Sequence, residues 1–269
     1  MSTAVAFDKA RSEDRAALVG YLPAGFPTHE RAIEAIEVMV EHGCDVIELG
    51  LPYTDPVMDG PQVQAAALQA LEGGTRTADV LRTVEAVAAT GVPTVVMTYW
   101  NPVAKYGVER FAVDLSNAGG AGLITPDITP DFAPDWIAAA DAHGLDKVFL
   151  VSPSSTDERI AMTTAACRGF VYATAVMGVT GTRASTSGLA GPLVARTKLT
   201  TDLPVGVGLG ISSGAQAAEV AATDGIGADG VIVGSAFIRV LLDHADDRAA
   251  GLRALAALTE DLARGVRRA

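Results

Sequence analysis

The feature that most constrains the fold is one unit repeated along the chain, a short apolar run followed by a longer segment with helical spacing. The apolar runs are rich in valine, leucine and isoleucine and are nearly continuous, without strict alternation of polar residues. Such runs are typical of strands in a parallel sheet that is covered on its outside. They occupy residues 16–21, 45–51, 94–99, 122–126, 147–152, 170–175, 204–209 and 230–234.

The segments between the runs have the spacing of amphipathic helices. They include residues 29–42, 61–72, 77–90, 108–118, 134–143, 156–167 and 215–222. About eight strand–helix units in 269 residues predict an α/β fold of the (β/α)₈ barrel type. A doubly wound open sheet is the alternative, but its first turn is typically G-x-G-x-x-G. Here that turn reads Leu22-Pro-Ala-Gly25-Phe-Pro27, which does not match.

Two segments exceed a plain barrel. An amphipathic stretch before residue 16 predicts an extra N-terminal helix that closes the bottom of the barrel. Two helical patterns, broken at Gly73-Gly74, lie between the second and third strands and predict one further helix there. We expect a single barrel domain over residues 1–269, and its last element should be a helix at 249–267.

Charge and cysteine usage limit the classes of partner. The net charge of −12 and the pI near 4.7 argue against nucleic acid or an anionic membrane as the main partner. Cys44 and Cys167 have no metal-ligand spacing, and both fall at predicted helix-to-strand junctions as small buried hydrophobes. The charged N-terminal residues contain no signal-peptide core. We therefore expect a protein of the reducing cytoplasm.

Glu48 is the strongest catalytic candidate. It lies in the middle of the apolar run 46–51, and a loop rich in proline, glycine and aspartate follows it with Asp55 and Asp59. A buried glutamate is costly unless it is paired or protonated, and proton transfer is a common reason for one. The plainer interpretation is a salt-bridged strand end with turn-forming aspartates. We interpret Glu48 and Asp59 as catalytic, and Asp55, which precedes a proline, as structural.

Barrel enzymes carry their chemistry where the strands end. Among the strand ends are Tyr21, Tyr99, Asp127 and Tyr172, and the loop after the sixth strand contains Thr180 and Gly181. The last two strands end in glycine turns at 208–212 and 234–235. Backbone N–H groups of such turns bind phosphate in many barrels, although glycines there can also serve only for tight turns.

Acid–base chemistry by carboxylates is the mechanism that these residues favour. A Schiff base needs a lysine at a strand end, and Lys147 instead begins its strand. The four histidines form no cluster with carboxylates, so the sequence predicts no metal site. General acid–base catalysis remains.

At this point the motifs resemble the tryptophan synthase alpha chain family. The matching stretches follow one another along nearly the whole chain: ELGLPYTDPVMDGP at 48–61, MTYWNP at 97–102, GVTG at 178–181, GLGIS at 208–212 and GS at 234–235. The carboxylate loop is specific to the family, whereas many barrels share the two phosphate turns.

The resemblance implies a carbon–carbon lyase of the aldolase type that cleaves indole-3-glycerol phosphate to indole and glyceraldehyde 3-phosphate without a cofactor of its own. The family's catalytic residues match Glu48, as proton shuttle, and Asp59, as acceptor of the ring N–H. By the same resemblance, the substrate pocket contains Tyr21, Asp127, Tyr172 and Thr180, and the phosphate site contains Gly181, Gly210, Gly234 and Ser235.

The resemblance also implies a partner, a PLP-dependent beta chain that receives the indole through a tunnel in an α₂β₂ assembly. The loops at 53–60, near Asn101-Pro102 and after Asp127 should face it. Departures from the family pattern are Tyr53, Thr54 and Met58, and Ala175-Val176 in place of a frequent Ser-Arg pair before the closing loop. Two alternatives remain, a stand-alone indole-producing lyase and a non-catalytic barrel for allostery or channelling.

Overall fold

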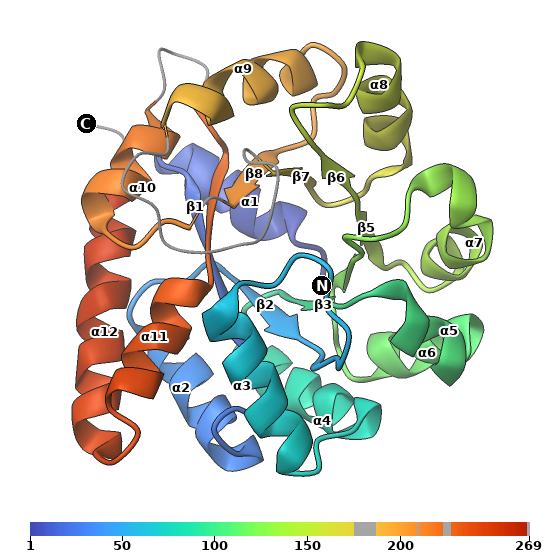
Figure 1. The fold of residues 1–269 in the computed structure, drawn as a ribbon. Coiled ribbons are helices and arrows are strands. Elements are labelled where there is room, and N and C mark those ends of the chain that lie inside the picture. Colours follow the sequence, from blue (N-terminus) through green and yellow to red (C-terminus); the bar gives the residue numbers. More distant parts are fainter. Residues whose placement is uncertain (175–186, 209, 223–226, 268–269) are drawn as a thin grey trace.

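A parallel sheet curls into a barrel at the centre of the molecule (Figure 1). The structure is a computed structural model, and it describes residues 1–174, 187–208, 210–222 and 227–267. The sheet order is β5-β4-β3-β2-β1-β9-β8-β7-β6. Because β5 and β6 are consecutive in the chain but lie at opposite ends of this order, the sheet must close on itself. The strands are β1 Ala17–Pro23, β2 Val46–Gly50, β3 Thr94–Met97, β4 Gly122–Ile124, β5 Asp146–Val148, β6 Leu150–Val151, β7 Val171–Thr174, β8 Val205–Gly208 and β9 Gly230–Val233.

The (β/α)₈ prediction is confirmed, and each predicted apolar run contains strand residues. The fifth run differs in one respect, since Phe149 divides it into β5 and β6. The Phe149 carbonyl accepts a hydrogen bond from the Tyr172 N–H at 3.2 Å, so this residue still joins the barrel wall. One predicted strand therefore accounts for two of the observed strands.

Helices surround the barrel, as the amphipathic patterns predict. In chain order they are α1 Ala4–Ser12, α2 His29–Glu41, α3 Pro61–Glu72, α4 Thr77–Ala88, α5 Trp100–Tyr106, α6 Val108–Asn117, the 3₁₀ turn η1 Pro130–Phe132, α7 Pro134–Ala142, α8 Asp157–Ala166, α9 Ser187–Lys198, α10 Gly214–Ala221, α11 Ser235–Asp243 and α12 Arg248–Gly265. None of the helices in the described ranges has both the length and the apolar character that a bilayer crossing needs.

Both predicted additions to the barrel are present. Helix α1 closes the bottom, where the ring of Phe7 packs against that of Phe170 with centroids 5.1 Å apart. Helices α3 and α4 both lie between β2 and β3, and Gly74, with a φ of 88°, belongs to the turn that separates them. A left-handed backbone is readily adopted by glycine, so the Gly73-Gly74 break ends α3 as expected.

The inner face of the barrel is filled in layers, as is typical of this fold. One layer contains Val19, Val46, Val95, Phe170 and Ile232, all buried, with Phe7 below it. Side chains two residues apart in a strand point to the same face. The residues two positions further along these strands therefore point into the same interior, one layer closer to the carboxyl ends.

Candidate active site

Glu48 belongs to this upper layer, because it lies two residues after Val46 on β2. Its side chain is 3% exposed, and its Oε2 atom has no hydrogen-bond partner among the described residues. Burial, and to a smaller extent the negative charge of Asp59, raises the pKa of the carboxyl from 4.5 to about 8. At neutral pH this group is a protonated acid, which can both donate a proton and take it back.

Two tyrosines share the layer with Glu48. Tyr21 is the register partner of Glu48 on β1, and Tyr172 lies two residues after Phe170 on β7. Burial raises the pKa of both phenols, and the charge of Glu48 contributes to each. The structure thus brings together Tyr21, Glu48 and Tyr172, three of the predicted site residues, from three different strands.

Glycines make room for these rings. A Cβ atom added at Gly50 would lie 2.4 Å from the Tyr21 hydroxyl, and one added at Gly208 would lie 2.2 Å from the Tyr172 hydroxyl. Contacts that short do not occur between a real Cβ and a neighbour, so each ring lies directly against bare backbone. The position of the aromatic rings at the barrel mouth depends on these two residues having no side chain.

Asp59 joins the site from the loop between β2 and α3. Its Oδ1 atom accepts a hydrogen bond of 2.7 Å from the Tyr99 hydroxyl, which in turn accepts one of 3.2 Å from the Met58 N–H. Partial burial raises the pKa of Asp59, and the bond from Tyr99 opposes that rise. The charge of Asp59 also raises the pKa of Glu48 and of Tyr21, so the loop carboxylate and the barrel interior act on one another.

Tyr99 is a site residue that the predicted set lacks. It follows β3 and is buried, and its ring packs on that of Tyr53 with centroids 5.5 Å apart. Asn101 donates a hydrogen bond of 3.0 Å to the Tyr53 hydroxyl. The sequence places Tyr99 at a strand end, and its hydrogen bond to Asp59 is the observation that adds it to the site.

Asp127 occupies the rim rather than the interior. Its two carboxylate oxygens accept hydrogen bonds from the Trp100 N–H at 2.9 and 3.1 Å, which caps the start of α5. Asp127 is exposed, whereas Glu48 and the two tyrosines point inward. As placed, its carboxylate holds the loop after β4 to the start of α5.

The phosphate-site residues that the structure describes lie after two adjacent strands. Strands β8 and β9 pair through Gly208 and Ile232, and Gly210 and Gly234 follow these residues. Gly234 is the N-cap of α11, Ser235 is its first residue, and no side chain among the described residues caps this end of the helix. Uncapped N–H groups and the positive end of the helix dipole favour an anion there.

Gly181 of the predicted phosphate site and Thr180 of the predicted substrate pocket fall outside the described residues, as does the Ala175-Val176 pair. Within the described ranges, no three histidine, cysteine or carboxylate side chains are grouped so that they could hold a metal ion.

Comparison with known proteins decides the family. The family model described as tryptophan synthase alpha chain matches residues 7–267. The chain belongs to this family. The tryptophan synthase alpha chain of Salinispora arenicola is 64% identical over 98% of this chain and 97% of its own length. That of Streptomyces coelicolor is 58% identical over 96% of this chain and 94% of its own.

Solved structures lead to the same family. A chain in a structure of Mycobacterium tuberculosis tryptophan synthase superimposes with a TM-score of 0.92, at 53% identity over 99% of this chain and 98% of that one. The family resemblance and the barrel fold predicted from the sequence are both confirmed. The chain is thus a tryptophan synthase alpha chain by family, a lyase of tryptophan biosynthesis.

Proposed function

We propose that this chain cleaves indole-3-glycerol phosphate to indole and glyceraldehyde 3-phosphate in a retro-aldol reaction that needs no cofactor in this chain. The observation that carries the proposal is Glu48, a buried carboxyl with an unpartnered oxygen and a pKa of about 8. A group that must act first as an acid and then as a base works best with a pKa near the working pH.

In this mechanism Glu48 transfers two protons. Its carboxylic acid first protonates the indole ring carbon that bears the glycerol phosphate chain, which makes the ring a better leaving group. The resulting carboxylate then accepts the proton of the side-chain hydroxyl next to the bond that breaks. Its burial supports this role, because a carboxylate formed in a dry site is a stronger base than one in water.

Asp59 would accept a hydrogen bond from the ring N–H and stabilise the positive charge that develops on the ring as its carbon is protonated. The Tyr99 hydroxyl supports this role, since its 2.7 Å bond fixes one oxygen of Asp59 and leaves the other for the substrate. Tyr21 and Tyr172, which lie beside Glu48, would hold the indole and the glycerol chain between them. Asp127 would line the substrate pocket only at its rim, where its carboxylate accepts hydrogen bonds from the Trp100 N–H.

The phosphate group would bind at the start of α11. The N–H groups of Gly234 and Ser235, together with Gly210 on the neighbouring turn, are suited to an anion in a chain whose net charge is −12, because local N–H dipoles replace a basic surface. Gly181 would complete this site from the loop after β7, and Thr180 in the same loop would belong to the substrate pocket.

We also propose that the chain works with a PLP-dependent beta chain in an α₂β₂ assembly, to which it passes indole. Two exposed apolar side chains support a partner surface at the barrel mouth, Val57 on the carboxylate loop and Phe132 in η1, which are 71% and 75% exposed. The free thiols Cys44 and Cys167 support a cytoplasmic location, where thiols remain reduced.

The test is indole release from indole-3-glycerol phosphate by the purified chain, with and without a beta chain. We expect release that rises with the partner and collapses in Glu48→Gln, while Glu72→Gln, an exposed control at the end of α3, behaves as wild type. Fast release without a partner would favour a stand-alone lyase. Release that Glu48→Gln leaves intact would remove Glu48 from the mechanism.

A further inference from the structure

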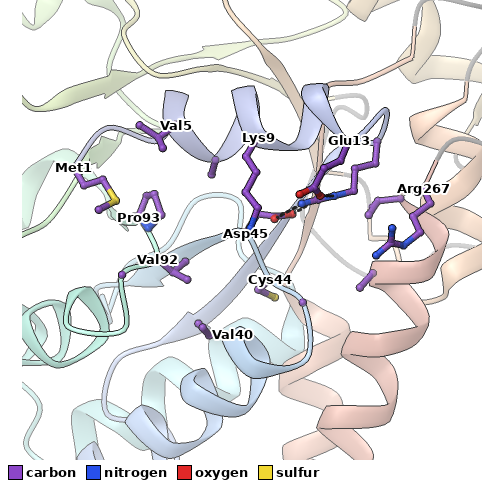
Figure 2. Close-up of a pocket in the computed structure, with 16 residues that line it drawn as sticks. Met1, Val5, Lys9, Glu13, Val40, Cys44, Asp45, Val92, Pro93 and Arg267 are labelled. Atoms are coloured by element: carbon purple, nitrogen blue, oxygen red, sulfur yellow. Dashed lines mark hydrogen bonds and ion pairs between the residues drawn. The ribbon is translucent and has the colours of Figure 1, made fainter.

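A cavity of about 420 Å³ opens beneath the barrel, at the end opposite the proposed active site (Figure 2). It lies between α1 and the loops that lead into β1, β2 and β3, where Asp45 and Pro93 precede their strands. Its volume falls in the range of small-molecule sites in proteins. No residue of the proposed lyase chemistry lines it.

Helix α1, the roof of this cavity, is fixed at both ends. At its start the Thr3 N–H and hydroxyl both donate hydrogen bonds of 2.7 Å to Asp146, whose side chain is fully buried. Beyond its end the Ala16 N–H donates a 3.0 Å bond to the Val266 carbonyl. Phe7 anchors the middle of the helix in the barrel. The cavity is therefore preformed, which lowers the entropic cost of binding.

One end of the cavity is charged in both signs. The buried Arg15 guanidinium holds Asp45 through bonds of 2.6 and 2.8 Å and Glu13 Oε2 through one of 2.7 Å. Glu13 is fixed by this bond, yet its side chain is 43% exposed and can accept a further donor. Lys9 and Arg267, also at the cavity, lie within ion-pair distance of no carboxylate in the described part of the chain.

The other end of the cavity is apolar. Figure 2 shows Met1, Val5 and Pro93 on the side away from Glu13 and Arg267. Met1 and Val5 are 65% and 58% exposed, two of the few large hydrophobic side chains with that exposure among the described residues. The polarity of the walls is thus divided between the two ends of one cavity.

We propose that this cavity binds a free α-amino acid with an apolar side chain. The ammonium would lie on Glu13, the carboxylate on Lys9 or Arg267, which flank Glu13 in Figure 2, and the side chain against Val5 and Pro93. A plain carboxylate would be repelled by Glu13, and a plain amine by the two cations. A zwitterion satisfies both signs at the charged end while its side chain fills the apolar end.

The test is an NMR titration of the full chain, labelled with ¹⁵N, with L-phenylalanine as the probe. We expect saturable shifts at the amides of Val5 and Val92, weakened about tenfold or more in the double variant Lys9→Gln/Arg267→Gln. The control is Arg253→Gln, an exposed arginine on α12 away from the cavity, which should bind as wild type. All three sites are exposed, so the variants should fold.

Two analogues test the recognition itself. Phenylalanine methyl ester lacks the carboxylate and 3-phenylpropanoate lacks the ammonium, so each should bind about tenfold more weakly than L-phenylalanine. The proposal is overturned if L-phenylalanine gives no saturable shifts, or if its shifts fall only at the barrel mouth around Tyr21 and Tyr172. Equal binding of 3-phenylpropanoate, or wild-type binding by the double variant, would overturn it as well.

Discussion

Replacing Glu48 with glutamine should remove a pH-dependent loss of stability from the folded chain, even though it also removes the proposed proton shuttle. In the folded chain the carboxyl keeps its proton up to about pH 8, whereas the unfolded chain loses it near the ordinary pKa of 4.5. Between these values the folded state binds more protons, so stability falls as the pH rises, by about 1.4 kcal/mol per pH unit. At pH 7 the raised pKa of Glu48 therefore costs about 3 kcal/mol of folding free energy.

Glutamine has the shape of glutamate but does not ionise, so the cost disappears in the variant. The buried amide itself changes the free energy of unfolding by the same amount at every pH. The informative quantity is therefore how the difference in free energy of unfolding between variant and wild type changes with pH. Urea denaturation followed by circular dichroism should show that Glu48→Gln gains about 3 kcal/mol on wild type between about pH 5 and about pH 8. The exposed control Glu72→Gln should show no such gain. If the difference in free energy of unfolding between Glu48→Gln and wild type stays constant, or shrinks as the pH rises, the reasoning is refuted, because Glu48 would then be ionised in the folded chain.

Three further changes test other contacts of the fold and site. Tyr99→Phe removes a hydrogen bond that lowers the pKa of Asp59. The value of kcat/KM should therefore fall about tenfold or more, and the acidic limb of its pH profile should move to higher pH, while Tyr106→Phe should change neither. An acidic limb that stays in place would count against a role for this bond. Gly234→Ala places a Cβ 3.0 Å from the Tyr21 ring at the start of α11. KM should rise about tenfold with little change in kcat, and a loss in kcat alone would contradict phosphate binding there. Asp146→Asn leaves buried donors poorly matched and should lower the free energy of unfolding in urea by about 2 kcal/mol, and no loss would show that the N-terminal tie is dispensable.

The strands could be predicted because each is an uninterrupted apolar run, and burial on both faces imposes that pattern at every position. The break at Phe149 could not, since it depends on how the last two edges of the sheet meet when the barrel closes. The helical spacing does not predict α5, because this helix is short and contains Pro102 near its start. In α9 an internal proline, Pro192, interrupts the helical signal.

The barrel part of the site was predictable for the same reason as the strands. Glu48 lies in a run that is apolar on both sides of it, so the sequence predicts its burial. The packing of Val46, two residues earlier, shows that this face of β2 is the barrel interior. Asp59 could be identified as a candidate but its partner could not, because the bond to Tyr99 depends on the path of a loop of ten residues between β2 and α3. Loop paths are set by tertiary contacts that leave no period in the sequence.

The contact between Tyr172 and Gly208 also bears on how this sequence can change over time. A side chain at Gly208 would occupy the space of the Tyr172 hydroxyl, so any larger residue there is tolerated only together with a smaller one at the other position. The two residues lie on the neighbouring strands β7 and β8 but are not register partners, and they are far apart in the sequence. We expect each single replacement to be damaging and a matched pair to restore the packing of the barrel mouth, so that the two positions should change together.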